Sequence, residues 1–355
     1  MRCEQRGGAV IEARETAPPL WQPLPAWQRE AAAAALQARA RWPHALLITG
    51  RRGIGKRILA LHFAQALLCE QPNADGSACG RCPSCTYVVN GTHPDLRLIE
   101  PVERDDEGNN PTPVDTIVVD RIRELIEFTQ LSTHRQRAKV AVIVPAETLN
   151  TAAENALLKT LEEPPAATYL ILVSHQPGRL AATIISRCRL LASPEPDPDA
   201  AVAWLSAQGV PEPQLLLAQA GCAPLLALTL ADPIVQRERE LLLDELAQPE
   251  RLAPVAVGAR IDAYGKDERK ARLADVVYWL LTWTSDLAVV GSGGAPRFNP
   301  DREDALALLG ARVARLKLFR YYQTLLGQRA LLGHPLQPRL VAEALLFEYR
   351  AMFAR

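Results

Sequence analysis

Short apolar runs alternate with amphipathic stretches along the first half of the chain. The runs have the length and two-sided apolar character of strands buried in a parallel sheet. They are residues 44–49, 96–99, 140–144, 168–174 and 189–192. The stretches between them place apolar side chains at helical spacing, at residues 27–40, 57–68, 114–131, 151–163 and 180–185. This alternation predicts an α/β domain in which helices flank a parallel sheet.

Beyond this region the pattern is helical throughout. The stiff segment Pro194-Glu-Pro-Asp-Pro198 reads as a linker. Helices are predicted at residues 200–207, 212–220, from 225, 235–247, 254–263, 266–288, 301–332 and 337–353. Expected packing residues are Leu306, Leu309, Val313, Leu316, Trp279, Trp283, Phe319, Tyr321 and Tyr322. We therefore expect a leader (1–19), an α/β domain (20–193), a small helical domain (194–233) and a helical C-terminal domain (234–355).

Charge and composition narrow the function classes. The chain has 355 residues, with 40 basic and 40 acidic side chains, so its formal net charge is zero. Autonomous nucleic-acid binding usually requires a basic excess, so the balance favours protein partners. We see no hydrophobic signal core in residues 1–8 and no apolar run that approaches the length of a membrane span. The expected location is therefore the cytoplasm.

A glycine-rich turn follows the first predicted strand. Gly50-Arg-Arg-Gly-Ile-Gly-Lys56 stands between a strand and a helix, the context of a phosphate-binding P-loop. The backbone at Gly50, Gly53 and Gly55 would cradle phosphates, and Lys56 would reach them. A complete P-loop continues with Ser or Thr, whose hydroxyl holds Mg²⁺, but this chain has Arg57. Binding of ATP or ADP therefore stays open, and no Mg²⁺ site is expected.

A second metal-handling position is also replaced. In a P-loop ATPase the strand at residues 140–144 would end in carboxylates that hold Mg²⁺ and orient water. Here it ends in Val144-Pro145, and the nearest carboxylate, Glu147, lies beyond the expected place. Ser174 ends the next strand, where a polar residue would sense the γ-phosphate. Two independent losses predict a chain without ATPase activity of its own.

Four of the seven cysteines are bunched. Cys69, Cys79, Cys82 and Cys85 follow a C-x9-C-x2-C-x2-C pattern with glycine and proline between them. Four thiolates at this spacing can complete a tetrahedral zinc shell, and such a closed shell is structural. The alternative is a set of unrelated free cysteines. We predict a structural zinc module over residues 69–85.

Three local details complete the pattern. Thr151 and Glu154 form a Thr-x-x-Glu capping box at the start of a predicted helix. Residues 103–113 are acidic and rich in Gly, Asn and Pro, so they predict a loop. His93 stands before a proline, which favours a turn residue over a metal ligand.

Taken together, the ordered motifs resemble a known family. They are Gly50–Lys56, the four cysteines, Gly91–Asp95, Asn155–Pro165 and Ser186–Cys188. This set is similar to subunits of the bacterial sliding-clamp loader of DNA polymerase III, an AAA+ assembly. The resemblance implies an α/β P-loop AAA+ domain with an inserted zinc knuckle, then a lid domain and an all-α collar domain that holds the oligomer together. The losses at Arg57 and Val144-Pro145 set the chain apart from the ATP-hydrolysing tau/gamma type.

The resemblance also assigns a role to one arginine. On spacing alone, Arg187 reads as a surface salt-bridge residue. In the family the arginine of Ser-Arg-Cys enters the ATP site of an adjacent subunit, which would make Arg187 a trans finger, with Ser186 and Cys188 shaping the turn.

The partners implied are tau/gamma and delta subunits in a hetero-pentamer, the sliding clamp and primer–template DNA. The isolated chain would be inactive, although part of a DNA-directed DNA polymerase holoenzyme. The alternatives are an active ATPase of the tau/gamma type and a zinc-containing DNA-binding adaptor.

Overall fold

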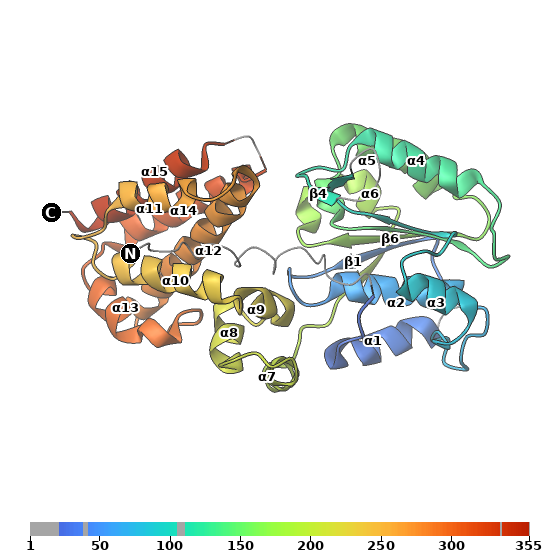
Figure 1. Ribbon diagram of the computed structural model, residues 1–355, viewed down its shortest axis with the longest axis horizontal. Coiled ribbons are helices and arrows are strands. Elements are labelled where there is room, and N and C mark those ends of the chain that lie inside the picture. The colour runs from blue at the N-terminus through green and yellow to red at the C-terminus, as the bar shows by residue number, and fades with distance from the viewer. Residues whose placement is uncertain (1–20, 38–41, 105–110, 334–335, 355) are drawn as a thin grey trace, which may run out of the picture. The chain divides into compact units, whose positions relative to one another are not determined.

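A five-stranded parallel sheet organises the first part of the chain (Figure 1). Its order is β2-β5-β6-β1-β7. The strands are β1 (Ala45–Thr49), β2 (Leu96–Ile99), β5 (Lys139–Ile143), β6 (Thr168–Ser174) and β7 (Arg189–Ala192). In this computed structural model the described residues are 21–37, 42–104, 111–333 and 336–354. The predicted leader at 1–19 lies outside them.

Helices cover both faces of this sheet (Figure 1). Alternate residues of β1 point to opposite faces, as strand geometry requires. Leu46 and Ile48 pack with α1 (Ala26–Gln37) and α2 (Lys56–Leu68). Ala45 and Leu47 pack with the opposite layer, which consists of α4 (Val119–Gln130), α5 (Thr151–Glu162) and α6 (Ala182–Ile185). The prediction of a parallel sheet flanked by helices is confirmed.

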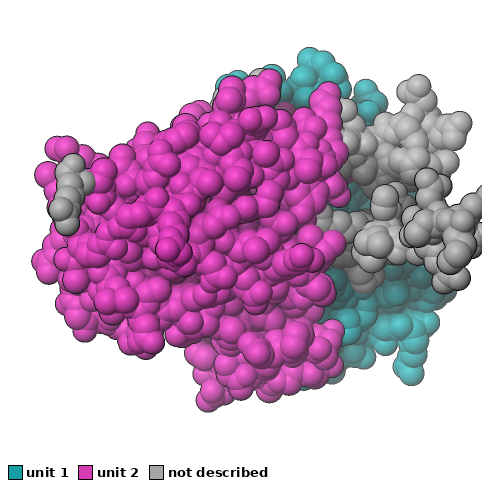
Figure 2. All heavy atoms as spheres, turned by 60° about the vertical axis from the view of Figure 1, so that its left-hand side comes forward, with its two compact units in different colours: residues 1–49, 56–100, 117–193 teal, residues 50–55, 101–116, 194–355 magenta. Residues whose placement is uncertain are grey.

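The chain forms two compact units, coloured separately in Figure 2. The first comprises residues 1–49, 56–100 and 117–193, and the second residues 50–55, 101–116 and 194–355. The helices of the second unit are α7 (Pro198–Ala207), α8 (Pro213–Gln219), α9 (Pro224–Leu230), α10 (Pro233–Leu246), α11 (Pro254–Asp262), α12 (Lys266–Val290), α13 (Glu303–Gly310), α14 (Arg315–Leu331) and α15 (Pro338–Phe353). Many begin with proline, whose fixed φ suits the first helical turn.

The second unit has one continuous apolar core. It runs from α7 residues such as Leu205 to α15 residues such as Leu346. A hydrogen-bonded chain crosses it, because Trp283 Nε1 donates to Tyr349 Oη (2.9 Å) and Tyr349 Oη donates to the Leu246 carbonyl (2.9 Å). The polar atoms of both aromatic side chains are therefore satisfied inside the core.

The single helix predicted over residues 301–332 was wrong, because α13 ends at Gly310 and α14 starts at Arg315. Glycine has low helix propensity, and a Cβ at position 310 would lie 3.1 Å from the Gly291 Cα. The close approach of these two backbones accompanies the end of the helix. In α14, Leu316 and Phe319 are exposed and do not pack in the core as expected.

Two local predictions also need correction. The helix α5 is capped by Asn150, whose side chain accepts from the Ala153 backbone N–H (2.8 Å), and Thr151 lies already inside the helix. Glu154 instead accepts from the Ala181 N–H (3.3 Å). The ends of the predicted loop at 103–113 form an antiparallel hairpin of β3 (Val102–Arg104) and β4 (Pro111–Pro113). Residues 105–110 lie outside the described part.

One described helix is long and apolar enough to cross a membrane by length and composition. It is the 23-residue stretch Glu268–Val290 of α12, so the expectation that no run approaches this length was wrong. More than half of the most apolar part of this stretch is buried within the structure. Trp279, Trp283 and Leu287 of this helix belong to the core of the second unit, which accounts for its apolar character.

Candidate functional site

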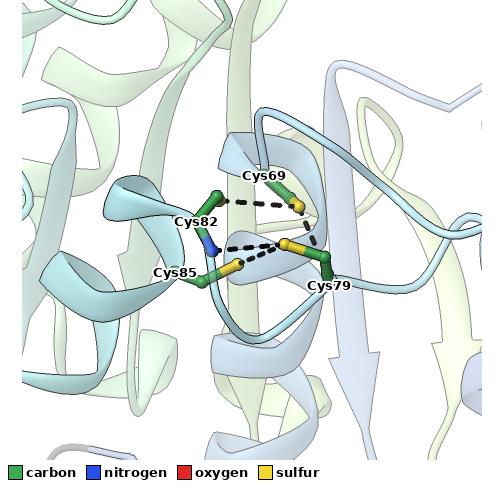
Figure 3. Close-up of side chains that lie close together, drawn as sticks. All are labelled: Cys69, Cys79, Cys82 and Cys85. Carbon is green, nitrogen blue, oxygen red and sulfur yellow. Dashed lines mark hydrogen bonds between the residues drawn. The ribbon is translucent and has the colours of Figure 1, made fainter.

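The four predicted metal ligands lie together at the end of α2 and the start of α3 (Pro83–Val89). Figure 3 shows the side chains of Cys69, Cys79, Cys82 and Cys85 pointing toward one another. Their Sγ atoms all lie within 4.8 Å of one another. The α2 helix delivers Cys69, and Gly80, with φ of 73°, permits the turn between the later cysteines.

The sulfur positions fit a tetrahedral cation. The Cys69–Cys82 and Cys79–Cys85 sulfur distances are 3.9 and 4.0 Å, too long for a disulfide. Tetrahedral zinc–sulfur bonds of about 2.3 Å would place the sulfurs about 3.8 Å apart. Backbone N–H groups of Cys79 and Cys82 also point at sulfurs of the cluster, at 3.3 and 3.4 Å. The cluster could therefore hold a metal such as zinc.

The electrostatics of the cluster also favour a cation. Burial raises the pKa of the Cys69 and Cys85 thiols. At Cys79 the backbone N–H of Arg81 has the opposite effect and lowers the pKa to about 6. A divalent cation would offset the cost of burying thiolates, so metal binding would deprotonate the raised thiols.

Two arginines of the loop before β5 contact the segments that carry the cysteines. Arg135 Nε donates to Glu70 Oε1 (3.0 Å), and Ser84 Oγ donates to the same oxygen (2.8 Å). Arg137 Nη2 donates to the Cys69 carbonyl (2.9 Å). These contacts tie both cysteine-bearing segments to the sheet. His93 is buried, and its Nδ1 accepts from the Asp95 N–H (3.0 Å), as expected of a turn residue.

The glycine-rich turn is packed against α9 of the second unit. Gly50, Gly53 and Gly55 all have positive φ, the conformation that glycine tolerates. The Gly53 carbonyl accepts from the Leu225 N–H (2.9 Å), and a Cβ at Gly53 would lie 2.9 Å from the Leu226 Cβ.

Arg51 of the same turn pairs with Glu195 and donates to the Gly221 carbonyl (2.6 Å). In the first unit, Lys56 begins α2 and is 2% exposed.

The position of the missing P-loop hydroxyl is taken by an ion pair. Arg57 Nε donates to Glu100 Oε1 (2.8 Å), and its Nη2 donates to Oε2 (3.3 Å). Glu100 follows the last residue of β2. Both side chains are half-buried, with 25% and 31% exposure. A cationic guanidinium cannot ligate Mg²⁺, so this position offers no metal ligand.

The end of β5 also lacks catalytic carboxylates. Val144 and Pro145 stand after β5, and the peptide between them is cis. Glu147 Oε1 accepts from the His175 N–H (2.9 Å), so this carboxylate ties the ends of two strands together. Ser174 Oγ accepts from the Gln176 N–H (3.2 Å) in a local turn.

Arg187 lies in the short turn between α6 and β7. Its Nε donates to Glu162 Oε1 (2.9 Å), and Nη2 pairs with the same oxygen. Its Nη1 donates to the Thr183 carbonyl (2.8 Å) and lies 3.4 Å from Ser186 Oγ. Cys188 packs at the edge of the apolar layer, and burial raises its pKa to about 11. The Arg187 side chain remains 32% exposed.

The structure thus brings the four cysteines together, as spacing predicted. Sequence reasoning missed the carboxylates that pair with the key arginines, Glu100 with Arg57 and Glu162 with Arg187. Glu100 follows the end of a predicted strand, and Glu162 lies in the last turn of a predicted helix. No spacing rule connects residues 25 or 43 positions apart in the chain.

Comparison with known proteins gives a consistent set of relatives. The family described as "DNA polymerase III, delta subunit" matches residues 30–196. The DNA polymerase III subunit delta' of Pseudomonas aeruginosa is 42% identical over 222 residues, which cover 61% of this chain and 64% of that protein. The alignment therefore spans slightly less than two thirds of that relative.

Two further relatives extend the comparison. The subunit delta' of Escherichia coli is 35% identical over 294 residues, 81% of each chain. The subunit tau of Bacillus subtilis is 36% identical over 149 residues, 42% of this chain and 24% of that protein. The delta' relatives align beyond the sheet into the helical unit, at identities that show common descent, and the chain belongs to the family of DNA polymerase III delta' subunits.

Proposed function

We propose that this chain is a non-hydrolysing subunit of the DNA polymerase III clamp loader. It assembles with ATP-hydrolysing subunits, supplies Arg187 to the ATP site of a neighbour, and helps to load the sliding clamp onto primer–template DNA. The observation that carries the proposal is the replacement of both metal-handling positions, by the Arg57–Glu100 pair and by Val144-Pro145.

The loss of chemistry follows from these replacements. Phosphoryl transfer depends on a metal that bridges phosphate oxygens and on a carboxylate that orients the nucleophile. Arg57 already carries a positive charge and is engaged by Glu100. Glu147 accepts from the His175 backbone. A nucleotide held by Gly50–Lys56 would therefore lack the groups that accelerate hydrolysis.

Arg187 supports the second half of the proposal. A planar guanidinium matches the oxygens of a phosphate, and its charge persists at any physiological pH. Arg187 is part of a turn fixed between α6 and β7, so its position is defined by regular elements. Its exposure lets an acceptor from outside the chain approach.

The helical unit supports assembly with other subunits. Several of its large apolar side chains are exposed, namely Leu308, Leu316, Phe319 and Leu340. Where such side chains form one contiguous patch, they commonly mark a protein interface. In the proposed arrangement residues 194–233 form the lid and residues 234–355 the collar, and tau/gamma and delta subunits complete a hetero-pentamer.

The cysteine cluster has a structural role in this proposal. Cys69, Cys79, Cys82 and Cys85 hold Zn²⁺, and the metal supplies folding free energy to residues 69–85. Four thiolates leave no open coordination position, so the metal takes no part in hydrolysis. Arg137, which donates to the Cys69 carbonyl, would add positive charge beside the anionic thiolates.

Reconstitution with candidate motor subunits tests the proposal. The isolated chain should show no ATP turnover above background by phosphate release. The complete loader should lose the turnover of one neighbouring site when Arg187→Ala is introduced, while assembly on a sizing column stays unchanged. Arg179→Ala is the matched control, because Arg179 is an exposed arginine of the same region. Unchanged DNA-stimulated ATPase in Arg187→Ala would refute the trans role.

A second candidate is an active ATPase of the tau/gamma type, favoured by the 36% identity to a tau subunit. Clear turnover by the isolated chain would establish it. Tight, salt-sensitive DNA binding by the isolated chain would instead favour a zinc-containing DNA-binding adaptor.

A further inference from the structure

We infer that Glu162 is the residue that positions Arg187 for catalysis in the neighbouring subunit. This inference rests on the proposed function, in which Arg187 acts in trans. Two glutamates are adjacent at the end of α5, Glu162 and Glu163, and the inference gives the positioning role to Glu162 alone. Glu162 touches no substrate in this role and acts through the arginine.

The contacts define the orientation of the guanidinium. Glu162 Oε1 accepts from Nε of Arg187 (2.9 Å) and pairs with Nη2. The Thr183 carbonyl accepts from Nη1 (2.8 Å), and Ser186 Oγ lies 3.4 Å from the same nitrogen. Every guanidinium nitrogen therefore has a partner within the chain. One Nη2 hydrogen has no partner among the described residues, and it is the donor left for an outside oxygen.

The place of Glu162 is unfavourable without Arg187. Glu162 is the last residue of α5, where the helix dipole disfavours a carboxylate. The positive charge of the Arg187 guanidinium offsets this unfavourable interaction, because the guanidinium lies beside the same carboxylate. Glu163 is the C-cap, and its backbone N–H donates to the Lys159 carbonyl. Its exposed side chain has no described contact with Arg187.

The platform beneath Glu162 is rigid. Helix α5 buries Leu157 and Leu161 against the sheet, with 0% and 1% exposure. Its first turn is fixed by the Asn150 cap. Positioning residues act best when regular elements and packing hold them. The carboxylate thus presents a fixed acceptor on one element to an arginine on another.

The expected consequence is preorganisation. A free arginine side chain samples many rotamers, and ordering it at the moment of binding would reduce its effect on the transition state. In this chain the contacts of Glu162 with Nε and Nη2 restrict the Arg187 side chain before the neighbouring subunit binds. Removal of Glu162 should therefore lower the turnover rate, and the ATP concentration for half-maximal rate should change little.

The test uses the complete reconstituted loader and measures kcat and KM for ATP. Glu162→Ala should lower the Arg187-dependent part of kcat by about three- to tenfold with KM nearly unchanged. Glu162→Gln should have a smaller effect, because its amide oxygen can still accept from Nε. Glu163→Ala, the matched control, should behave like wild type. Equal assembly and equal thermal unfolding midpoints confirm that the variants fold.

A double substitution shows whether Glu162 acts through Arg187 or independently of it. In a loader that already carries Arg187→Ala, the additional Glu162→Ala should change nothing. An additive loss would overturn the inference, and so would a wild-type or raised kcat in Glu162→Ala alone. If Arg187→Ala itself has no effect, the proposed function fails first and this inference fails with it.

Discussion

Two arginine–glutamate pairs in the sheet-containing unit share their chemistry and differ in geometry. Arg57 donates to both oxygens of Glu100, at 2.8 and 3.3 Å. Arg187 donates to a single oxygen of Glu162 and to the Thr183 backbone. Exposure is 25% and 31% in the first pair and 32% and 50% in the second.

The difference indicates which pair can serve another molecule. The Arg57 pair is a two-point contact in which each carboxylate oxygen receives one donor. The Arg187 pair leaves Glu162 Oε2 and one Nη2 hydrogen without partners among the described residues. Within the proposed function, the first pair occupies the place of the P-loop hydroxyl, whereas the second pair leaves a donor for an outside phosphate.

The largest effect should appear when Arg187 is removed from the complete loader, with removal of Arg57 as the comparison. Arginine fingers contribute about 10³-fold or more to kcat at the site they enter. Arg187→Ala should therefore silence the neighbouring site, and total ATPase should fall by at least the share of that site. Arg57→Ala should leave loader ATPase unchanged. Equal losses in the two variants would contradict the division between the pairs.

Loss of the cysteine cluster should give the next largest effect, on the stability of the unit that contains both pairs. Cys82→Ser breaks the four-thiolate set, so elemental analysis should change from one zinc per chain to none. The unfolding free energy should fall by an amount on the order of several kcal/mol. Cys222→Ser, outside the cluster, should keep the metal. Wild-type protein without zinc would remove the proposed metal site.

A smaller effect should distinguish the two pairs in the isolated chain. Arg57→Ala leaves a half-buried carboxylate without its cation, which should cost about 1–2 kcal/mol of unfolding free energy. Arg187→Ala removes a more exposed ion pair and should lower the unfolding free energy by less than about 1 kcal/mol. Urea unfolding measures both. A larger loss for Arg187→Ala would mean that its pair is the structural one.

Sequence patterns located the elements of the sheet well, because buried parallel strands are continuous apolar runs. The residues of β1 and β6 match the predicted runs within one position. The cysteine cluster was also predictable, because its ligands lie within one short segment. Helix ends in the second unit were harder. At the break after Gly310 the backbone comes close to Gly291, which follows the end of α12 and is distant in the chain.

The ion-pair partners in the site could not be predicted, because they are far apart in the chain. Arg57 and Arg187 were visible as substituted or motif residues, but their carboxylate partners come from distant segments. The parallel order of β2 beside β5 brings Glu100 near α2, and that order is a property of the sheet. Glu162 was part of a recognised run, yet nothing in the run separates it from Glu163.

The smallest effect concerns the helix that carries Glu162. Asn150→Ala should lower the unfolding free energy by about 1 kcal/mol, because the side chain accepts from the Ala153 N–H. Thr151→Ala should cost less than about 0.5 kcal/mol, because Thr151 is exposed inside the first turn. The sequence pattern predicts the reverse order, with Thr151 as the cap. If Thr151→Ala proves the more destabilising change, the capping box is the true start of α5, and the assignment of Asn150 as the cap is wrong.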